Sequence, residues 1–148
     1  MAFTSSPSPS LRQVVELYLI SLVVFFAVDL LWLGVVAQPY YQSQLGHLLR
    51  PAVVWPSALA FYLFFLVGLL VFVILPAVAA DSLRRAAALG ALYGFITYQT
   101  YELTNHALID RWPLAIVFVD IAWGMVLSTV VAVATTRVAR ALAARRRR

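Results

Sequence analysis

The stretch PSALAFYLFFLVGLLVFVILP, residues 56–76, contains no charged side chain and decides the fold class. A membrane-spanning helix needs about 20 consecutive apolar residues, so this stretch is long enough to cross a bilayer. Further apolar runs of similar length precede and follow it. The sequence therefore predicts an all-α integral membrane four-helix bundle, with spans at about residues 14–37, 56–79, 86–108 and 113–138.

The composition of the whole chain supports this prediction. Of the 148 residues, 64% are apolar and 11% are charged, whereas a soluble domain carries about 25% charged residues. A soluble protein of this size could not bury so many apolar side chains. Cysteine is absent, which excludes disulfides and thiolate metal sites. We expect a transmembrane domain at residues 14–138, between a disordered cytoplasmic N-terminal tail (1–13) and a basic cytoplasmic tail (139–148).

The arginine residues predict the orientation of the spans. With four crossings, nine of the 11 arginines lie on one side, and only Arg50 and Arg111 lie on the other. The positive-inside rule then places both termini in the cytoplasm. The span at 86–108 has the shortest apolar stretch, but without it the arginine-rich tail would lie outside. Orientation and attraction to anionic lipids of the bilayer explain the net charge of +5, so no nucleic-acid partner is expected.

Three acidic residues inside the predicted spans, Asp29, Glu102 and Asp120, carry the functional signal. At 1.5 Å per residue, each lies roughly 10–12 Å below the outer end of its helix, and no arginine shares that depth. Two carboxylates about 6 Å apart repel by roughly 3 kcal/mol at an effective dielectric constant near 20. We therefore expect at least one of them to hold a proton, or the cluster to bind a cation. The alternative is that protonated acids only hydrogen-bond neighbouring side chains and stabilise the bundle.

Polar and aromatic side chains accompany these acids at helical spacing. In the span 86–108 they follow the i, i+3, i+4, i+7 pattern, and Gly90 and Gly94 continue the same stripe as a close-packing surface. Residues 28–32 and 119–123 share the pattern V-D-x-x-W, in which an indole N–H lies on the same face as a carboxylate. The candidate proton or ligand site consists of Asp29, Glu102, Asp120, Asn105, Tyr98, Tyr101, Trp32 and Trp123.

Two weaker candidates lie outside this set. The segment 40–49 between the first two spans is amphipathic, and its His47 and Gln44 are candidates for a lid over the acids; an interfacial linker is the alternative. Glu102 and His106, one helical turn apart, are the residues that a metal site would use. Two histidines are too few for a histidine-rich di-iron site, so we expect no metal and no other cofactor.

Several motifs together resemble one known family. They are DLLWLG (29–34), YQSQLGHLL (41–49), YELTN (101–105), Trp112-Pro113 and VDIAWG (119–124). This combination resembles the bacterial membrane-protein family known as domain of unknown function 2177. The resemblance implies a four-helix inner-membrane protein without an established activity. In that family the third-helix motif is usually YDLTN, so Glu102 is a conservative departure from it. The family has no histidine at the position of His106. Family members often accompany fatty-acid-modifying enzymes, which implies a lipid-metabolism enzyme as a partner.

Taken together, these features favour a proton-linked carrier or ligand-binding membrane protein. Its carboxylates would exchange protons against a small cationic or amphiphilic substrate. A homodimer is expected, because four helices alone enclose little space. The alternative is a membrane-embedded enzyme, or its accessory subunit, that acts on a lipid or isoprenoid by acid–base chemistry. The sequence does not decide whether the protein is an enzyme.

Overall fold

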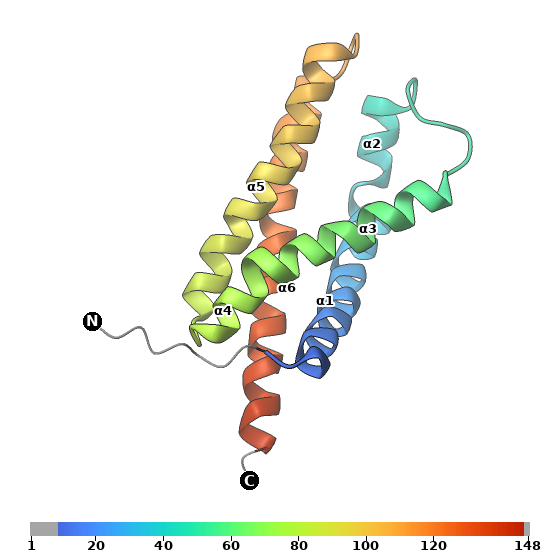
Figure 1. Cartoon of the computed structure of the whole chain (residues 1–148). Helices are drawn as coiled ribbons and strands as arrows, with labels where there is room; N and C mark the ends of the chain where they lie inside the picture. Colours follow the sequence, from blue (N-terminus) through green and yellow to red (C-terminus); the bar gives the residue numbers. More distant parts are fainter. Residues whose placement is uncertain (1–8, 147–148) are drawn as a thin grey trace.

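In a computed structural model, residues 9–146 are described, and these residues form helices without any strand (Figure 1). The prediction of an all-α protein is confirmed. In chain order the elements are α1 (Leu11–Leu31), η1 (Trp32–Val36), α2 (Gln38–Leu45), α3 (Trp55–Leu69), η2 (Leu70–Ile74), α4 (Leu75–Ala79), α5 (Leu83–Leu108) and α6 (Leu114–Arg146). The elements η1 and η2 are π-helical turns that continue the helix before them.

Three helices in the described part of the chain are long and apolar enough to cross a membrane. They are Leu11–Val36 with 26 residues, Trp55–Ala79 with 25 residues, and Leu114–Arg146 with 33 residues. Helix α5 is equally long, at 26 residues, but is not among them. The physical reason is the polar C-terminal half of α5, where glutamine, threonine, glutamate and asparagine interrupt the apolar residues.

The ends of the helical domain differ from the expected tails. Residues 1–8 of the predicted disordered tail lie outside the described residues, and α1 already begins at Leu11. Ser10 caps this helix, because its hydroxyl oxygen accepts a hydrogen bond from the backbone N–H of Gln13 at 3.3 Å. At the other end, α6 continues without interruption through the predicted basic tail as far as Arg146.

Helices α5 and α6 form a closely packed antiparallel pair (Figure 1). A Cβ atom added at Gly94 would lie 2.0 Å from the carbonyl oxygen of Gly124, and one added at Gly90 would lie 2.8 Å from Cα of Thr129. The two backbones are therefore in direct contact. The small residues at this interface permit that approach, as in other membrane helix pairs. The turn between the helices includes Arg111 in the left-handed region, with φ of 59°.

The elements α3, η2 and α4 follow one another without a break and form one long helical segment, which crosses the other helices obliquely (Figure 1). Pro76 explains its π-helical turn, because proline cannot donate to the carbonyl of Phe72 and its ring clashes with that group. Leu66 and Ile74 of this segment are fully buried and pack in one apolar core with Phe25 of α1 and Leu127 of α6. Through this core, the segment formed by α3, η2 and α4 packs against both α1 and α6.

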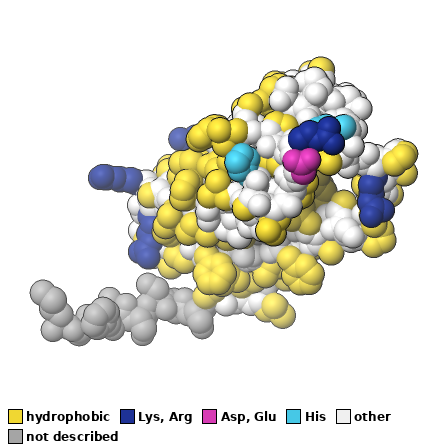
Figure 2. Space-filling view, turned by 90° about the horizontal axis from the view of Figure 1, so that it is seen from above, with side chains coloured by type: hydrophobic (Ala, Val, Ile, Leu, Met, Phe, Trp, Pro, Cys, Tyr) yellow, Lys and Arg dark blue, Asp and Glu magenta, His cyan; other side chains and the backbone are white. Residues whose placement is uncertain are grey.

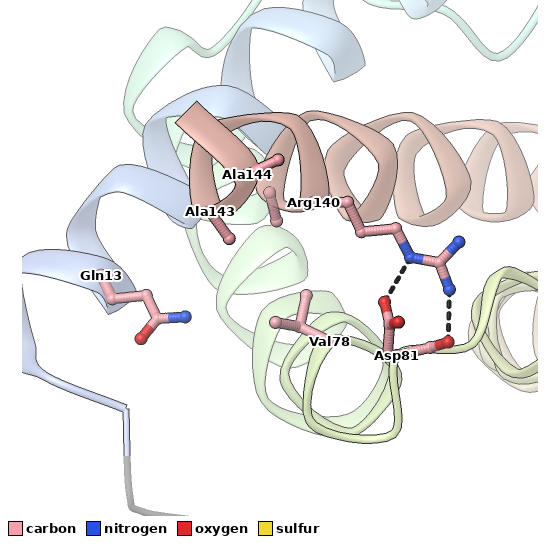
Figure 3. Close-up of a pocket in the computed structure, with 7 residues that line it drawn as sticks. Gln13, Val78, Asp81, Arg140, Ala143 and Ala144 are labelled. Atoms are coloured by element: carbon pink, nitrogen blue, oxygen red, sulfur yellow. Dashed lines mark hydrogen bonds and ion pairs between the residues drawn. The ribbon is translucent and has the colours of Figure 1, made fainter. Parts of the chain in front are cut away.

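Ion pairs join the helices at the end of the molecule where α1 begins and α6 ends. Arg146 donates to Glu16 at 2.7 Å, which links α6 to α1. A hollow of about 600 Å³ lies beside them. Figure 3 shows Arg140 at this hollow, where it points to Asp81 of the α4–α5 turn and pairs with its carboxylate. The opposite end, viewed in Figure 2, is mostly apolar or uncharged, and the exposed residues Asp110 and Arg111 lie 3.5 Å apart there.

Candidate functional site

The three acidic residues of the candidate site come from three helices and are shielded from solvent to different degrees. Asp29 on α1 is 4% exposed, Glu102 on α5 is fully buried, and Asp120 on α6 is half-buried. The carboxyl groups of Glu102 and Asp120 lie within hydrogen-bonding reach of each other. Asp29 does not join this pair directly, but Tyr98 lies close enough to both Asp29 and Asp120 to sense their charges.

Each of these acids accepts a hydrogen bond from an aromatic side chain. The indole N–H of Trp123 donates to Oδ1 of Asp29 at 3.3 Å. The indole N–H of Trp112 donates to Oε2 of Glu102 at 2.9 Å, and the hydroxyl of Tyr41 donates to Oδ1 of Asp120. Among the described residues, no arginine or histidine forms an ion pair with any of the three. Neutral donors therefore provide the partners that a basic residue would otherwise supply.

The two V-D-x-x-W segments interact with each other across the α1–α6 interface. The ring of Trp32 stacks on that of Trp123, with centroids 4.4 Å apart and planes inclined by 11°. Trp123 then donates to the aspartate of the other segment, Asp29, rather than to its own neighbour Asp120. The sequence spacing predicts that the indole and the carboxylate of each segment lie on the same face of one helix. In the structure, the indole of one segment bonds to the carboxylate of the other segment, on a different helix.

Two side chains that the sequence analysis did not select complete the site. Tyr41 reaches Asp120 from α2, and Trp112 reaches Glu102 from the turn before α6. Trp112 also packs edge-on against Tyr101, with ring centroids 6.0 Å apart. The sequence contains a feature that could have identified Trp112. It lies in a tight turn, and such a turn returns the chain beside the helix before it, where Glu102 lies. Tyr41 lies in the segment expected to form a lid.

The residues named for that lid lie elsewhere. His47 is exposed beyond the end of α2, and Gln44 is half-buried on that helix. The side chain of neither residue forms a hydrogen bond with another described residue. His106 is exposed as well, while Asn105 is half-buried one turn from Tyr101. Within residues 9–146, no group of three or more His, Asp or Glu side chains is arranged to hold a metal ion.

Burial affects the ionisation of Tyr41, which lies outside the membrane-spanning helices. The pKa of its hydroxyl is raised well above the usual value of 10.0, first by burial and second by its hydrogen bond to Asp120. A deprotonated tyrosine would place a second negative charge beside that carboxylate. Tyr41 therefore remains a hydrogen-bond donor throughout the physiological pH range.

Two polar atoms of the site are buried without a hydrogen-bond partner among the described residues. They are Oε1 of Glu102 and Nε1 of Trp32. The second oxygen of Glu102 already accepts from Trp112, so Oε1 is the oxygen left without an N–H or O–H donor. A buried acceptor of this kind costs about 1–3 kcal/mol unless something donates to it.

A pocket of about 520 Å³ opens beside the acids. Its walls come from α3, α5 and α6, and the lining residues are Phe61, Phe65, Thr97, Tyr98, Tyr101 and Asp120. Small-molecule sites in proteins are about 300–1,000 Å³, mostly apolar, with a few polar groups. The pocket has this size and character, and among residues 9–146 the one acidic or basic side chain that lines it is Asp120.

Comparison with known proteins agrees with this description of an apolar helical protein. No curated protein and no solved structure gives a significant match. The sequence model of one family, described as predicted membrane protein (DUF2177), matches residues 14–137, which include every residue of the site. The resemblance of the motifs is thereby confirmed, and the chain belongs to the DUF2177 family of predicted membrane proteins.

Proposed function

We propose that this protein is a proton-linked carrier or ligand-binding protein whose proton site is the Glu102–Asp120 pair. The observation that carries the proposal is the direct approach of two carboxyl groups without a basic partner among the described residues. Two full charges about 4 Å apart repel by about 4 kcal/mol at an effective dielectric constant of 20. A single proton shared between the oxygens removes that repulsion. It also gives one carboxyl a donor for the other.

Such a pair exchanges its proton as a unit. The two groups titrate together, and a cation that approaches one of them displaces the shared proton. Asp29 belongs to the same proposed site through Trp123 and Tyr98, which connect it to α6 and α5. The site therefore has the parts that proton–substrate exchange requires.

The proposal includes four crossings, with both termini in the cytoplasm of a bacterial inner membrane. Support comes from the arginine distribution and from the packing of α5 along the full-length span α6. Because the chain lacks cysteine, single-cysteine variants test the topology directly. An impermeant maleimide added to intact cells should label Asp110→Cys and not Ala80→Cys. Labelling of both positions from the same side would exclude a crossing by α5.

The transport proposal is tested in proteoliposomes with an imposed pH gradient. We expect proton flux in the wild-type protein, and loss of that flux in Glu102→Gln and Asp120→Asn. Asp110→Asn is the matched control, because it removes the same charge from a fully exposed turn. Flux that is absent in the wild type, or unchanged in both site variants, would contradict the proposal.

A second candidate function is supported by the position of Asp120, one member of the acid pair, at an aromatic pocket. One protonated and one ionised carboxyl can act as general acid and general base, and the faces of Tyr98 and Tyr101 can stabilise a developing cation. The substrate would be a lipid or isoprenoid, and the protein would be an enzyme or the accessory subunit of one. Lipid analysis of a deletion strain distinguishes this function, because loss of an enzyme leaves a product missing. Copurification of a lipid-metabolism enzyme from native membranes would indicate the accessory role.

A further inference from the structure

The pocket lies where two helices separate. Helices α3 and α5 are joined at Phe65, whose carbonyl accepts a hydrogen bond from the hydroxyl of Tyr93 at 2.9 Å and whose ring packs on that of Tyr93. Towards the N-terminal end of α3 the two helices diverge (Figure 1). Phe61 on α3 and Tyr101 on α5 line the opening above this junction.

The edges of this opening face the surroundings of the protein. Phe61 is 50% exposed and Tyr101 is 58% exposed, whereas Phe65 at the bottom is buried. Because α3 belongs to a span without charged residues, its exposed face lies against lipid in a membrane. A molecule dissolved in the outer half of the bilayer can therefore enter the pocket sideways, without passing through water.

The chemistry of the walls favours one class of occupant. Four aromatic residues line the pocket together with Asp120, and no arginine or histidine of residues 9–146 lines it. The hydroxyl of Thr97 donates to the carbonyl of Tyr93, so its O–H is not available to donate to a ligand. The hydroxyl of Tyr98 makes no hydrogen bond with another described residue. Aromatic faces and a carboxylate attract cations and repel anions.

A buried atom near Asp120 is the second observation that supports a ligand here. Glu102 is fully buried, and its Oε1 has no hydrogen-bond partner among the described residues. A positive charge bound at Asp120 would compensate both carboxylates and would replace the proton that they otherwise share.

We propose that this pocket binds an amphiphilic organic cation, which enters from the outer leaflet between α3 and α5 and places its charge at Asp120. This inference rests on the proposed function, because it assigns the substrate class of the same site. The apolar part of the ligand lies between Phe61 and Tyr101, and its charged part lies against Asp120 and the face of Tyr98.

The experiment uses the purified full-length protein in lipid nanodiscs, with tetraphenylphosphonium as the probe. Tetraphenylborate serves as an anion of nearly the same size and shape. We expect saturable binding of the phosphonium and none of the borate. Asp120→Asn should weaken phosphonium binding by about 10-fold or more, and Phe61→Ala by about 3- to 10-fold through loss of a ring face. Phe64→Ala is the matched control, because Phe64 is a neighbouring lipid-facing ring, 76% exposed, that does not line the pocket.

The route of entry is tested with the same probe. Tetraphenylphosphonium should slow the reaction of Phe61→Cys with a membrane-permeant maleimide and leave that of Phe64→Cys unchanged. Absent phosphonium binding, equal binding of the borate, or equal affinity in Asp120→Asn, Phe61→Ala and Phe64→Ala would overturn the proposal. Release of a proton when the phosphonium binds, measured in weakly buffered solution, distinguishes the proposed proton linkage from the proposed ligand class. Binding without release contradicts the proton linkage and leaves the ligand class standing.

Discussion

The contact between α5 and α6 predicts that Gly94→Ala destabilises the protein strongly for so small a change. The added methyl carbon would lie 2.0 Å from the carbonyl oxygen of Gly124 and 2.8 Å from Cα of Met125. Ordinary contact begins at 3.4 Å, so the nearest atom is too close by 3.4 − 2.0 = 1.4 Å. Both atoms belong to the backbone, and no side-chain rotation can relieve the overlap.

The magnitude follows from the way in which the helices must respond. They have to separate locally by about 1 Å, and a gap of that size forfeits a quarter to a half of each dispersion contact nearby. Overpacking of a close-packed core typically costs about 1–3 kcal/mol, and the rigid backbone on both sides places Gly94→Ala near the upper end. We therefore expect a loss of about 2–3 kcal/mol in the free energy of unfolding.

The assay is equilibrium unfolding in mixed detergent micelles, with increasing SDS and circular dichroism as the signal. Gly34→Ala is the matched control, because an added Cβ there meets nothing within 4 Å. Alanine is favoured over glycine in a helix by about 1 kcal/mol, so Gly34→Ala should leave stability unchanged or raise it slightly. Equal stability of the Gly94→Ala and Gly34→Ala variants would refute the direct backbone contact between α5 and α6.

Two further predictions concern the donors around the acids. Trp123→Phe keeps an aromatic ring on Trp32 but removes the N–H that donates to Asp29, so it should cost about 1–3 kcal/mol in the same unfolding assay. Trp32→Phe, which removes an indole N–H without an acceptor among the described residues, should cost less; the reverse order would contradict the assigned hydrogen bond. Tyr41 has a pKa raised by burial and then by its bond to Asp120, so the folded chain keeps a proton that the unfolded chain loses near pH 10.0. The contribution of Tyr41 to stability is complete below that pH and declines above it. The unfolding temperature of the Tyr41→Phe variant should therefore fall less steeply than that of the wild type between about pH 9 and 11. An equally steep fall in both proteins would exclude this contribution of Tyr41.

Part of the arrangement of these side chains could be predicted, because helical periodicity fixes the face of a helix on which a residue lies and its distance from the helix end. Asp29, Glu102 and Asp120 were expected at one level from their distances to the helix ends, and the structure places Glu102 beside Asp120. Gly90 and Gly94 were expected at a close contact for the same reason, and their contact with α6 follows the predicted stripe. These features depend only on the rise and twist of a helix.

The donors outside the long helices could not be predicted in this way. The path of the segment before and after α2 is set by tertiary packing, so periodicity did not distinguish Tyr41 from Gln44 or His47 as the residue that reaches the acids. Mean hydropathy does not select α5 as a candidate span. A scale that averages over all faces of a helix does not record that Glu102 is fully buried.

The uninterrupted length of α6 has a mechanical consequence. Its 33 residues extend about 50 Å, whereas the hydrocarbon layer is about 30 Å thick. No glycine or proline follows Gly124, so this section has no built-in hinge. The helix carries Asp120 towards one end and Arg140 and Arg146 towards the other. A displacement of its arginine-bearing end would therefore be transmitted along the helix to the carboxyl pair.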